Sequence, residues 1–259
     1  MRIKSEKQRI FPVHFAEGKK LMHVVVRLSD APGSLSSILE LLASRVNLVG
    51  TTTYAFSDGT ALFSGFAEAL SPGETPEGLR DLVLKSKAAK EADVVEGNGG
   101  LLVDTFHTGF EVEDEAYVLL KRDGMAQMFE RVSKMLGSGG ETLLYEEGRA
   151  MGQRYASSLV KRIGKERLRA NAAALNRSLT ARGLGEVERR GDAGRGFTVT
   201  VRDCFECSGN RKARTACSFM RGYLAGALAE EVGRDLDSLE RRCRVNGDEF
   251  CEFDFTPRR

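Results

Sequence analysis

The cysteines of this 259-residue chain gather near its C-terminal end. They are Cys204, Cys207, Cys217, Cys243 and Cys251. Thiolates are ligands of zinc and other soft cations, and such a cluster in a reducing compartment favours a metal site over disulfides. The charged N-terminus, Met1 to Arg9, has no apolar core or cleavage site of a signal peptide, and no apolar run is long enough to span a membrane. We therefore expect a cytoplasmic protein.

The segment from Cys243 to Cys251 is the most informative, because its centre consists of turn residues. If Asn246, Gly247 and Asp248 form a three-residue hairpin loop, Cys243 faces Cys251 on one side of the sheet. Two thiolates then lie within chelating distance of one ion. A closed tetrahedral site needs two more ligands, and spacing leaves the choice open among Glu240, Cys217, Cys204 and Cys207.

Residues 120 to 257 resemble the 4-vinyl reductase domain family in two motifs. The closing motif of that family, approximately E-x-x-C-x-x-x-G-x-x-x-C-x-F, is met by Glu240, Cys243, Gly247, Cys251 and Phe253. The segment from Cys217 to Gly226 resembles the family's C-x-F-x-x-G-x-x-x-G helix. The sensory domains of phenol- and xylene-responsive transcription activators belong to this family, so the resemblance implies a fold that binds small molecules.

The resemblance also implies a structural zinc ion, whose ligands by position are Cys217, Glu240, Cys243 and Cys251. A site closed in this way leaves no position for a substrate, and no catalytic or nucleotide-binding motif is recognisable, so we do not expect an enzyme. We expect an apolar ligand pocket walled by Tyr155, Phe197, Phe219 and Tyr223. Phenol is not the expected ligand, because the chain has no Trp and Arg221 stands where we expect an aromatic residue in phenol sensors.

Two interpretations of Cys204 and Cys207 stay open. They are either semi-buried thiols without a catalytic role, or a redox pair that cycles between dithiol and disulfide. No thioredoxin-like βαβ pattern surrounds them. The histidines, His14, His23 and His107, are not paired by spacing with another type of ligand, so we predict a structural role for each.

The elements that position these residues form two predicted domains of an α+β protein. The first half predicts strands at 21–28, 48–57 and up to Phe66, a helix from Leu35, a helix at 75–86 and a strand at 93–96. That order is the ferredoxin-like βαββαβ unit. The second half predicts helices at 123–136 and 141–163, a third amphipathic helix, strands at 185–190 and 197–203, a helix at 213–232 and a closing hairpin from 236 to 255. Pairs of glycines four residues apart, Gly148 with Gly152 and Gly222 with Gly226, predict that helices pack closely there.

The turn Asp30-Ala31-Pro32-Gly33-Ser34-Leu35 resembles the DxPGxL signature of ACT domains, and Asn47 falls where that family often has an Asn. We expect Asp30 to cap the following helix, and a carboxylate ligand to bind at Asp30, Gly33 and Asn47. The alternative is a helix-start turn without a ligand. The resemblance implies a regulatory or dimerising module over residues 20–97, preceded by an extension over 1–19, and hence a homodimer.

The segment Glu96-Gly97-Asn98-Gly99-Gly100 predicts the joint before a second domain over 101–259. A nucleotide-binding loop would need a following helix with a lysine, but only the strand-like Leu101 to Phe106 follows.

Charge and composition narrow the functional classes. The balance of 39 basic against 37 acidic residues gives a net charge of +2, so we expect no direct binding of nucleic acid. Three functions stay open. The first is a ligand-responsive regulator that acts through a protein partner, the second is an accessory or carrier protein of a tetrapyrrole pathway, and the third is a thiol redox switch.

Overall fold

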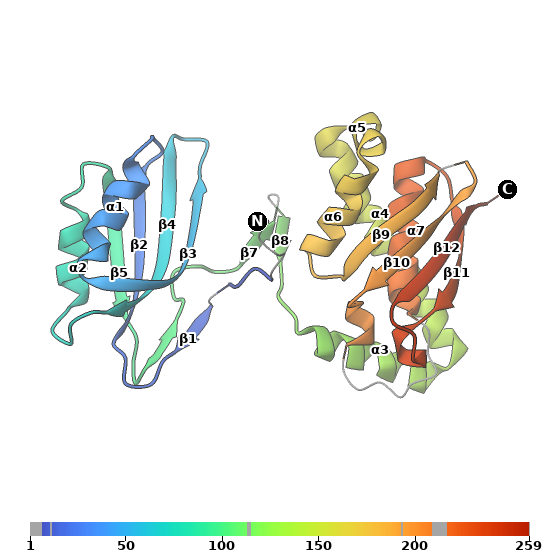
Figure 1. The fold of residues 1–259 in the computed structure, drawn as a ribbon, viewed down its shortest axis with the longest axis horizontal. Helices are drawn as coiled ribbons and strands as arrows, with labels where there is room; N and C mark the ends of the chain where they lie inside the picture. Colours follow the sequence, from blue (N-terminus) through green and yellow to red (C-terminus); the bar gives the residue numbers. More distant parts are fainter. Residues whose placement is uncertain (1–6, 11, 113–114, 193, 209–216, 259) are drawn as a thin grey trace. The chain divides into compact units, whose positions relative to one another are not determined.

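The computed structural model describes residues 7–10, 12–112, 115–192, 194–208 and 217–258. The chain forms two compact units, Met1–Val118 and Leu119–Arg259. Each unit contains a four-stranded antiparallel sheet with helices packed against it, which confirms the predicted α+β class (Figure 1). Among the described residues, no helix has the length and apolar character needed to cross a membrane.

Unit 1 has the predicted order of elements. They are β2 (Leu21–Ser29), α1 (Ser34–Ala43), β3 (Val46–Ala55), β4 (Thr60–Ala69), α2 (Pro76–Val83) and β5 (Ala89–Glu96). The sheet order is β3-β4-β2-β5, and all the pairs are antiparallel. This arrangement is the ferredoxin-like βαββαβ unit.

Alternating residues of β2 divide unit 1 into two layers. Val24, Val26 and Leu28 belong to the core that α1 and α2 cover. The opposite face of the sheet carries a smaller apolar cluster of Leu21, Phe66 and Leu102. Leu102 lies on β6 (Leu101–Val103), which pairs with β1 (Val13–Phe15). A second short ribbon, β7 (Phe110–Val112) with β8 (Glu115–Tyr117), follows.

The glycine-rich segment is a turn within unit 1, where we had predicted the joint between domains. The Gly97 N–H donates to the Leu21 carbonyl, and Asn98 and Leu101 exchange backbone hydrogen bonds. Because β6 returns to pair with β1, the two compact units divide after Val118 instead. Local flexibility therefore marked a turn, while strand pairing determined which unit it belongs to.

The predicted cap of α1 is wrong. The residue before the helix is Gly33, with φ at 87°, and no side chain caps the first turn. The exposed Asp30 uses its backbone N–H to bond the Gly59 carbonyl. A left-handed backbone at this point favours glycine over any residue with a Cβ atom.

Unit 2 begins with helices. They are α3 (Arg122–Leu136), α4 (Ser138–Ile163), α5 (Lys165–Ala170) and α6 (Ala172–Ala181), and the predicted third helix is thus divided at Asn171. The sheet of this unit has the order β11-β12-β10-β9. The remaining elements are β9 (Glu186–Asp192), β10 (Gly196–Arg202), η1 (Phe205–Cys207), α7 (Ser218–Val232), β11 (Leu236–Arg242), η2 (Arg244–Asn246) and β12 (Cys251–Pro257).

The helices α4 and α7 pack backbone to backbone through the four predicted glycines. A Cβ atom built on Gly152 would lie 2.0 Å from the Tyr223 carbonyl oxygen, and one on Gly226 would lie 2.0 Å from the Arg149 carbonyl oxygen. Atoms cannot approach so closely, so any side chain at these positions pushes the helices apart. Gly148 and Gly222 have equally short separations.

We predict that Gly226→Ala lowers the free energy of unfolding of unit 2 by at least about 2 kcal/mol, because the added methyl group overpacks the contact. Urea unfolding followed by circular dichroism measures the change. The matched control is Gly139→Ala in α4, where a Cβ atom meets nothing within 4 Å. The control should be neutral or slightly stabilising, by up to about 1 kcal/mol. Equal stabilities for the two variants would contradict the proposed close packing.

Candidate metal centre

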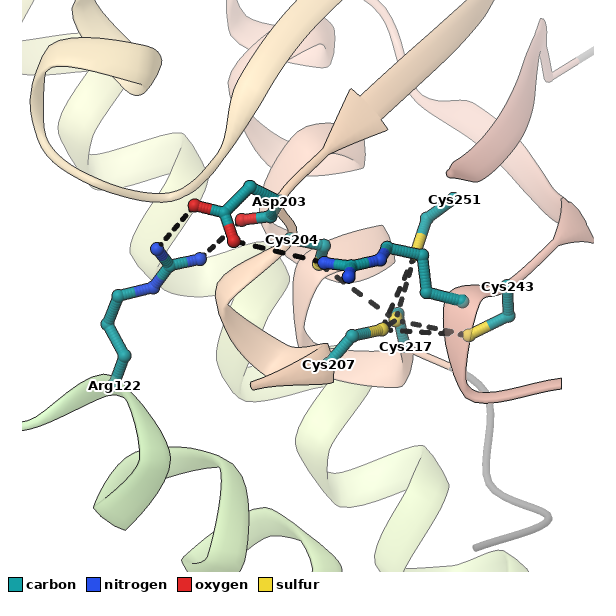
Figure 2. A network of polar contacts seen from close by, with 8 residues as sticks. Arg122, Asp203, Cys204, Cys207, Cys217, Cys243 and Cys251 are labelled. Carbon is teal, nitrogen blue, oxygen red and sulfur yellow. Dashed lines mark hydrogen bonds and ion pairs between the residues drawn. The ribbon is translucent and has the colours of Figure 1, made fainter. Parts of the chain in front are cut away.

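The thiols come from segments of unit 2 that meet at one end of its sheet. Cys204 and Cys207 follow β10, and Cys207 ends η1. Cys217 directly precedes α7, Cys243 follows β11, and Cys251 begins β12. Since Val201 on β10 pairs with Cys251, the end of β10 lies beside the start of β12. Figure 2 shows the sulfur atoms pointing toward one another.

Cys207 lies at the middle of the cluster. Its Sγ is 3.1 Å from the Sγ of Cys217, 3.4 Å from that of Cys251 and 3.8 Å from that of Cys243. Cys217 Sγ is 3.5 Å from Cys243 Sγ and 3.7 Å from Cys251 Sγ. Cys204 lies at the margin, 4.0 Å from Cys217. All five thiols are buried, so Cys204 and Cys207 are more deeply buried than we had predicted.

These separations fit one tetrahedral metal ion. Four sulfur atoms at ~2.3 Å from a zinc ion stand about 3.8 Å apart. In the predicted set, Cys217, Glu240, Cys243 and Cys251, the four ligand atoms lie within 4.8 Å of one another. The same holds for a second set, Cys204, Cys207, Cys217 and Cys251. The structure therefore brings the predicted residues together and adds Cys207 as a competing ligand.

The loop between Cys243 and Cys251 is longer than the predicted three-residue hairpin. The ladder of β11 and β12 ends at the pair Arg242 and Glu252, and η2 occupies part of the connection. Asp248 accepts the Cys243 N–H at 2.8 Å, and Gly247 has φ at 101°. Cys243 and Cys251 thus flank a loop rather than face each other in the ladder, yet both thiols reach the cluster.

Two carboxylates hold the start of α7. Glu240 accepts the Cys217 N–H at 3.1 Å. The buried Glu206 on η1 accepts the N–H groups of Phe219 at 3.3 Å and Met220 at 2.7 Å. These N–H groups have no partner within the helix, and a carboxylate also suits the positive end of the helix dipole. Our sequence reasoning missed Glu206, because capping by a distant segment leaves no local signal.

Contacts among the thiols shift their acidities in opposite directions. Hydrogen bonds from neighbouring thiols, foremost from Cys204, lower the pKa of Cys207. The same contacts raise the pKa of Cys217 and of Cys251, while burial raises the pKa of Glu240. One thiolate surrounded by protonated thiols is the state favoured without a cation. A divalent ion would allow several of them to ionise.

Asp203 connects the cluster to its surroundings. It is a non-glycine residue with positive φ, at 49°, directly before Cys204. Its carboxylate binds Arg122 of α3 at 2.8 Å and lies 3.8 Å from Arg244 of the hairpin loop (Figure 2). The strained turn is thus held by cations from two other segments.

A row of aromatic rings extends from the cluster into unit 2. Phe205 and Phe219 lie edge to face at 5.9 Å, and Phe129 of α3 stacks on Phe219 at 4.6 Å. Tyr223 is 6.2 Å from Phe219, and Tyr155 is 6.3 Å from Tyr223. We name Phe129, Phe205, Phe219, Tyr223 and Tyr155 the aromatic row.

Three of the four predicted pocket residues therefore lie together. Phe197 stands apart, beneath the Arg189 guanidinium at 4.7 Å. It lines a separate cavity of about 440 Å³ beside Leu239, Arg241 and Asp254. Arg221 packs over the Tyr145 ring at 4.9 Å and is not a member of the row.

The residues expected to bind a ligand in unit 1 are not brought together within one chain. Asp30 follows the last residue of β2, while Asn47 pairs with Glu68, which in turn pairs with Leu21 at the first residue of β2. The 9 residues of β2 separate them by about 27 Å at ~3.4 Å per residue. Gly33 shares the Asp30 end of the sheet.

Residues 197–257 match the model of the 4-vinyl reductase domain family. The matched segment contains the cysteine cluster, the whole of α7 and the closing hairpin. It is less than half of the chain.

An uncharacterized protein of Methanocaldococcus jannaschii is 28% identical over 118 residues, which cover 45% of this chain and 65% of that relative. The match thus spans less than two thirds of the relative's length.

Three solved structures show similarity at low identity. The phenol-responsive sensory domain of the transcription activator PoxR is 16% identical with a TM-score of 0.49, over 88% of this chain and 91% of that one. A vinyl-4-reductase family protein of Methanocaldococcus jannaschii is 18% identical with a TM-score of 0.40, over 56% and 85%. A trafficking protein particle complex subunit of Naegleria fowleri, covalently bound to palmitic acid, is 14% identical with a TM-score of 0.42, over 53% and 95%. Similarity at this level leaves the ligand to be inferred from the residues of this chain.

We predict that Cys243→Ser weakens metal binding and unfolds more readily than Cys204→Ser. Cys243 contacts two thiols of the cluster, whereas Cys204 lies at its margin, and metal binding at such a site stabilises the fold. Zinc content by mass spectrometry and melting temperature measure the effect, with an expected loss of affinity of at least roughly tenfold. Equal zinc content and equal melting temperatures for the two variants would contradict a shared centre.

Proposed function

We propose that this chain is a ligand-sensing regulatory protein, in which a zinc ion fixes unit 2 around a site for a small apolar or aromatic molecule. Zinc would be held by Cys217, Cys243 and Cys251 with Glu240 as the fourth ligand. Bound there, the ion would supply structural rigidity, because a closed site of protein ligands has no free position.

One observation carries the proposal: the aromatic row begins on the segments that bear the thiols. Phe205 lies between Cys204 and Cys207 on η1, and Phe219 follows Cys217 by two residues. A metal ion that fixes these segments also fixes the two rings. Displacing Phe129, which belongs to α3, would open space between rings that stay anchored.

The chemistry of the row indicates the class of ligand. Its members are buried, and offset or edge-to-face contacts among the rings favour flat apolar molecules. The Tyr155 hydroxyl is already bonded to Ser178. A polar group on the ligand would therefore compete with an existing hydrogen bond, and we expect apolar molecules to bind better than hydroxylated ones.

We predict that p-xylene, naphthalene or palmitic acid raises the melting temperature of the zinc-loaded full chain, and that Phe219→Leu weakens binding at least about tenfold, or 1.4 kcal/mol. Thermal shift and titration calorimetry provide the measurement. Leu239→Ala is the matched control, since Leu239 is half exposed at the other cavity. If Leu239→Ala lost binding while Phe219→Leu kept it, the ligand would bind in the cavity beside Phe197, and the row would be only core.

Homodimerisation through unit 1 is the second part of the proposal. The strands β3 and β5 are the edges of the sheet, with exposed apolar side chains at Tyr54 and Val95. Free edges of this kind pair readily between chains. Since Asn47 and Asp30 lie at opposite ends of one sheet, a ligand that touches both needs a second copy of the chain.

Sedimentation equilibrium of the full chain should give twice the monomer mass at micromolar concentration and a shift toward monomer on dilution. A fixed monomer mass over the whole range would refute the dimer and, with it, an amino-acid site built from Asp30, Gly33 and Asn47.

A further inference from the structure

A second group of metal-ligating side chains lies in unit 1. It consists of His23 on β2 with Asp104 and His107, which follow β6, and their ligand atoms lie within 4.8 Å of one another. Two of the three histidines of the chain therefore meet at one carboxylate. None of the thiols belongs to this unit.

The two layers of unit 1 explain how these residues meet. His23 alternates with Val24, so it points to the face of the sheet that α1 and α2 leave uncovered. Leu102 on β6 packs against Leu21 and Phe66 on that face, and the chain then runs directly to Asp104. The Asp104 Oδ1 accepts the N–H groups of Phe106 at 3.0 Å and His107 at 2.9 Å, which holds the carboxylate in place.

The orientation of His23 is suited to a metal ligand. Its Nε2 is 2.8 Å from the Ser64 Oγ, and its ring stacks near Phe66 at 4.6 Å. Its Nδ1 points to the Asp104 Oδ1 at 3.8 Å, too far for a hydrogen bond. Ligand atoms bound at ~2.0–2.1 Å to one ion stand about 2.9–4.2 Å apart, so an ion fits between these two atoms.

We propose that His23 Nδ1, the Asp104 carboxylate and His107 Nδ1 bind one divalent transition-metal ion. The hydrogen bond that now joins His107 Nδ1 to Asp104 Oδ2 at 2.7 Å would give way to two metal bonds, with the His107 proton on Nε2. Ser64 would accept the Nε2 proton of His23 and fix its tautomer, as outer-shell groups do in metal sites. Two imidazoles favour zinc, cobalt or nickel over magnesium or calcium.

The site opens into a cavity of about 1020 Å³, whose walls include Thr52, Tyr54, Ser64, Phe66, Asp104 and His107. Three protein ligands leave coordination positions free, and these positions face the cavity. The ion would therefore accept water or an oxygen-donor small molecule, unlike the closed thiol centre.

A nucleophilic triad is the competing interpretation, because Ser64, His23 and Asp104 lie in that order. The distance from His23 to Asp104 is too long for the orienting hydrogen bond of such a triad. Ser64 also lies within β4, between Val25 of β2 and Thr52 of β3. The ladders on both sides use the backbone N–H groups that would have to stabilise an oxyanion.

The experiment uses the full chain loaded with one equivalent of zinc, then titrated with cobalt(II). Thiolate ligands give cobalt an intense charge-transfer band in the near ultraviolet, whereas nitrogen and oxygen ligands give only weak visible bands. We expect a second equivalent to bind with weak visible bands alone. Asp104→Asn and His107→Ala should weaken its affinity at least roughly tenfold. His14→Ala is the control, and its affinity should be unchanged.

Absence of a second equivalent in the wild-type chain would overturn the proposal, whatever the variants do. Unchanged affinity in both folded variants, checked by circular dichroism, would also overturn it. The spectra separate this proposal from the thiol centre, because cobalt added to metal-free protein reports the two sites by different bands. A second ion with a charge-transfer band would show that both ions lie on cysteines.

Discussion

The backbone contact between α4 and α7 is the constraint on which the rest of unit 2 depends. The carbonyl oxygens of Phe219 and Tyr223 lie where Cβ atoms of Gly148 and Gly152 would stand, so only glycine admits α7 at this depth. That depth sets where α7 begins, and with it the position of Cys217. The aromatic row lies on the same turns of α7. Packing, metal ligation and the ligand site are therefore consequences of one close approach.

The start of α7 also shows how charge and metal chemistry share the same groups. Glu206 and Glu240 both accept backbone N–H groups there, so each carboxylate stabilises the helix before any ion is considered. Glu240 would have to divide its oxygens between the Cys217 N–H and a metal. Cys207 has no such second role, which makes the choice between a carboxylate and a fourth thiolate a balance of helix capping against sulfur affinity.

Unit 1 combines two different faces on one sheet. The helix-covered face is a continuous apolar core and explains the fold, whereas the other face carries His23 and Ser64 among apolar neighbours. Burying polar groups without partners costs free energy, so their presence needs a compensating contact. The segment after β6 supplies it through Asp104 and His107. Short strands that add little to the core thus complete a polar site.

The sequence alone determined the order of helices and strands, the glycine contact and the closing cysteine motif, because each depends on residues close in the chain. Asp30 as a helix cap, the three-residue hairpin loop and the joint at Gly97 to Gly100 were predicted from local patterns and changed in the structure. Cys207 in the cluster, Glu206 at α7, and His23 beside His107 were decided only by tertiary structure. Strand pairing and helix packing bring such residues together across long separations, and neither residue type nor spacing encodes the resulting distances.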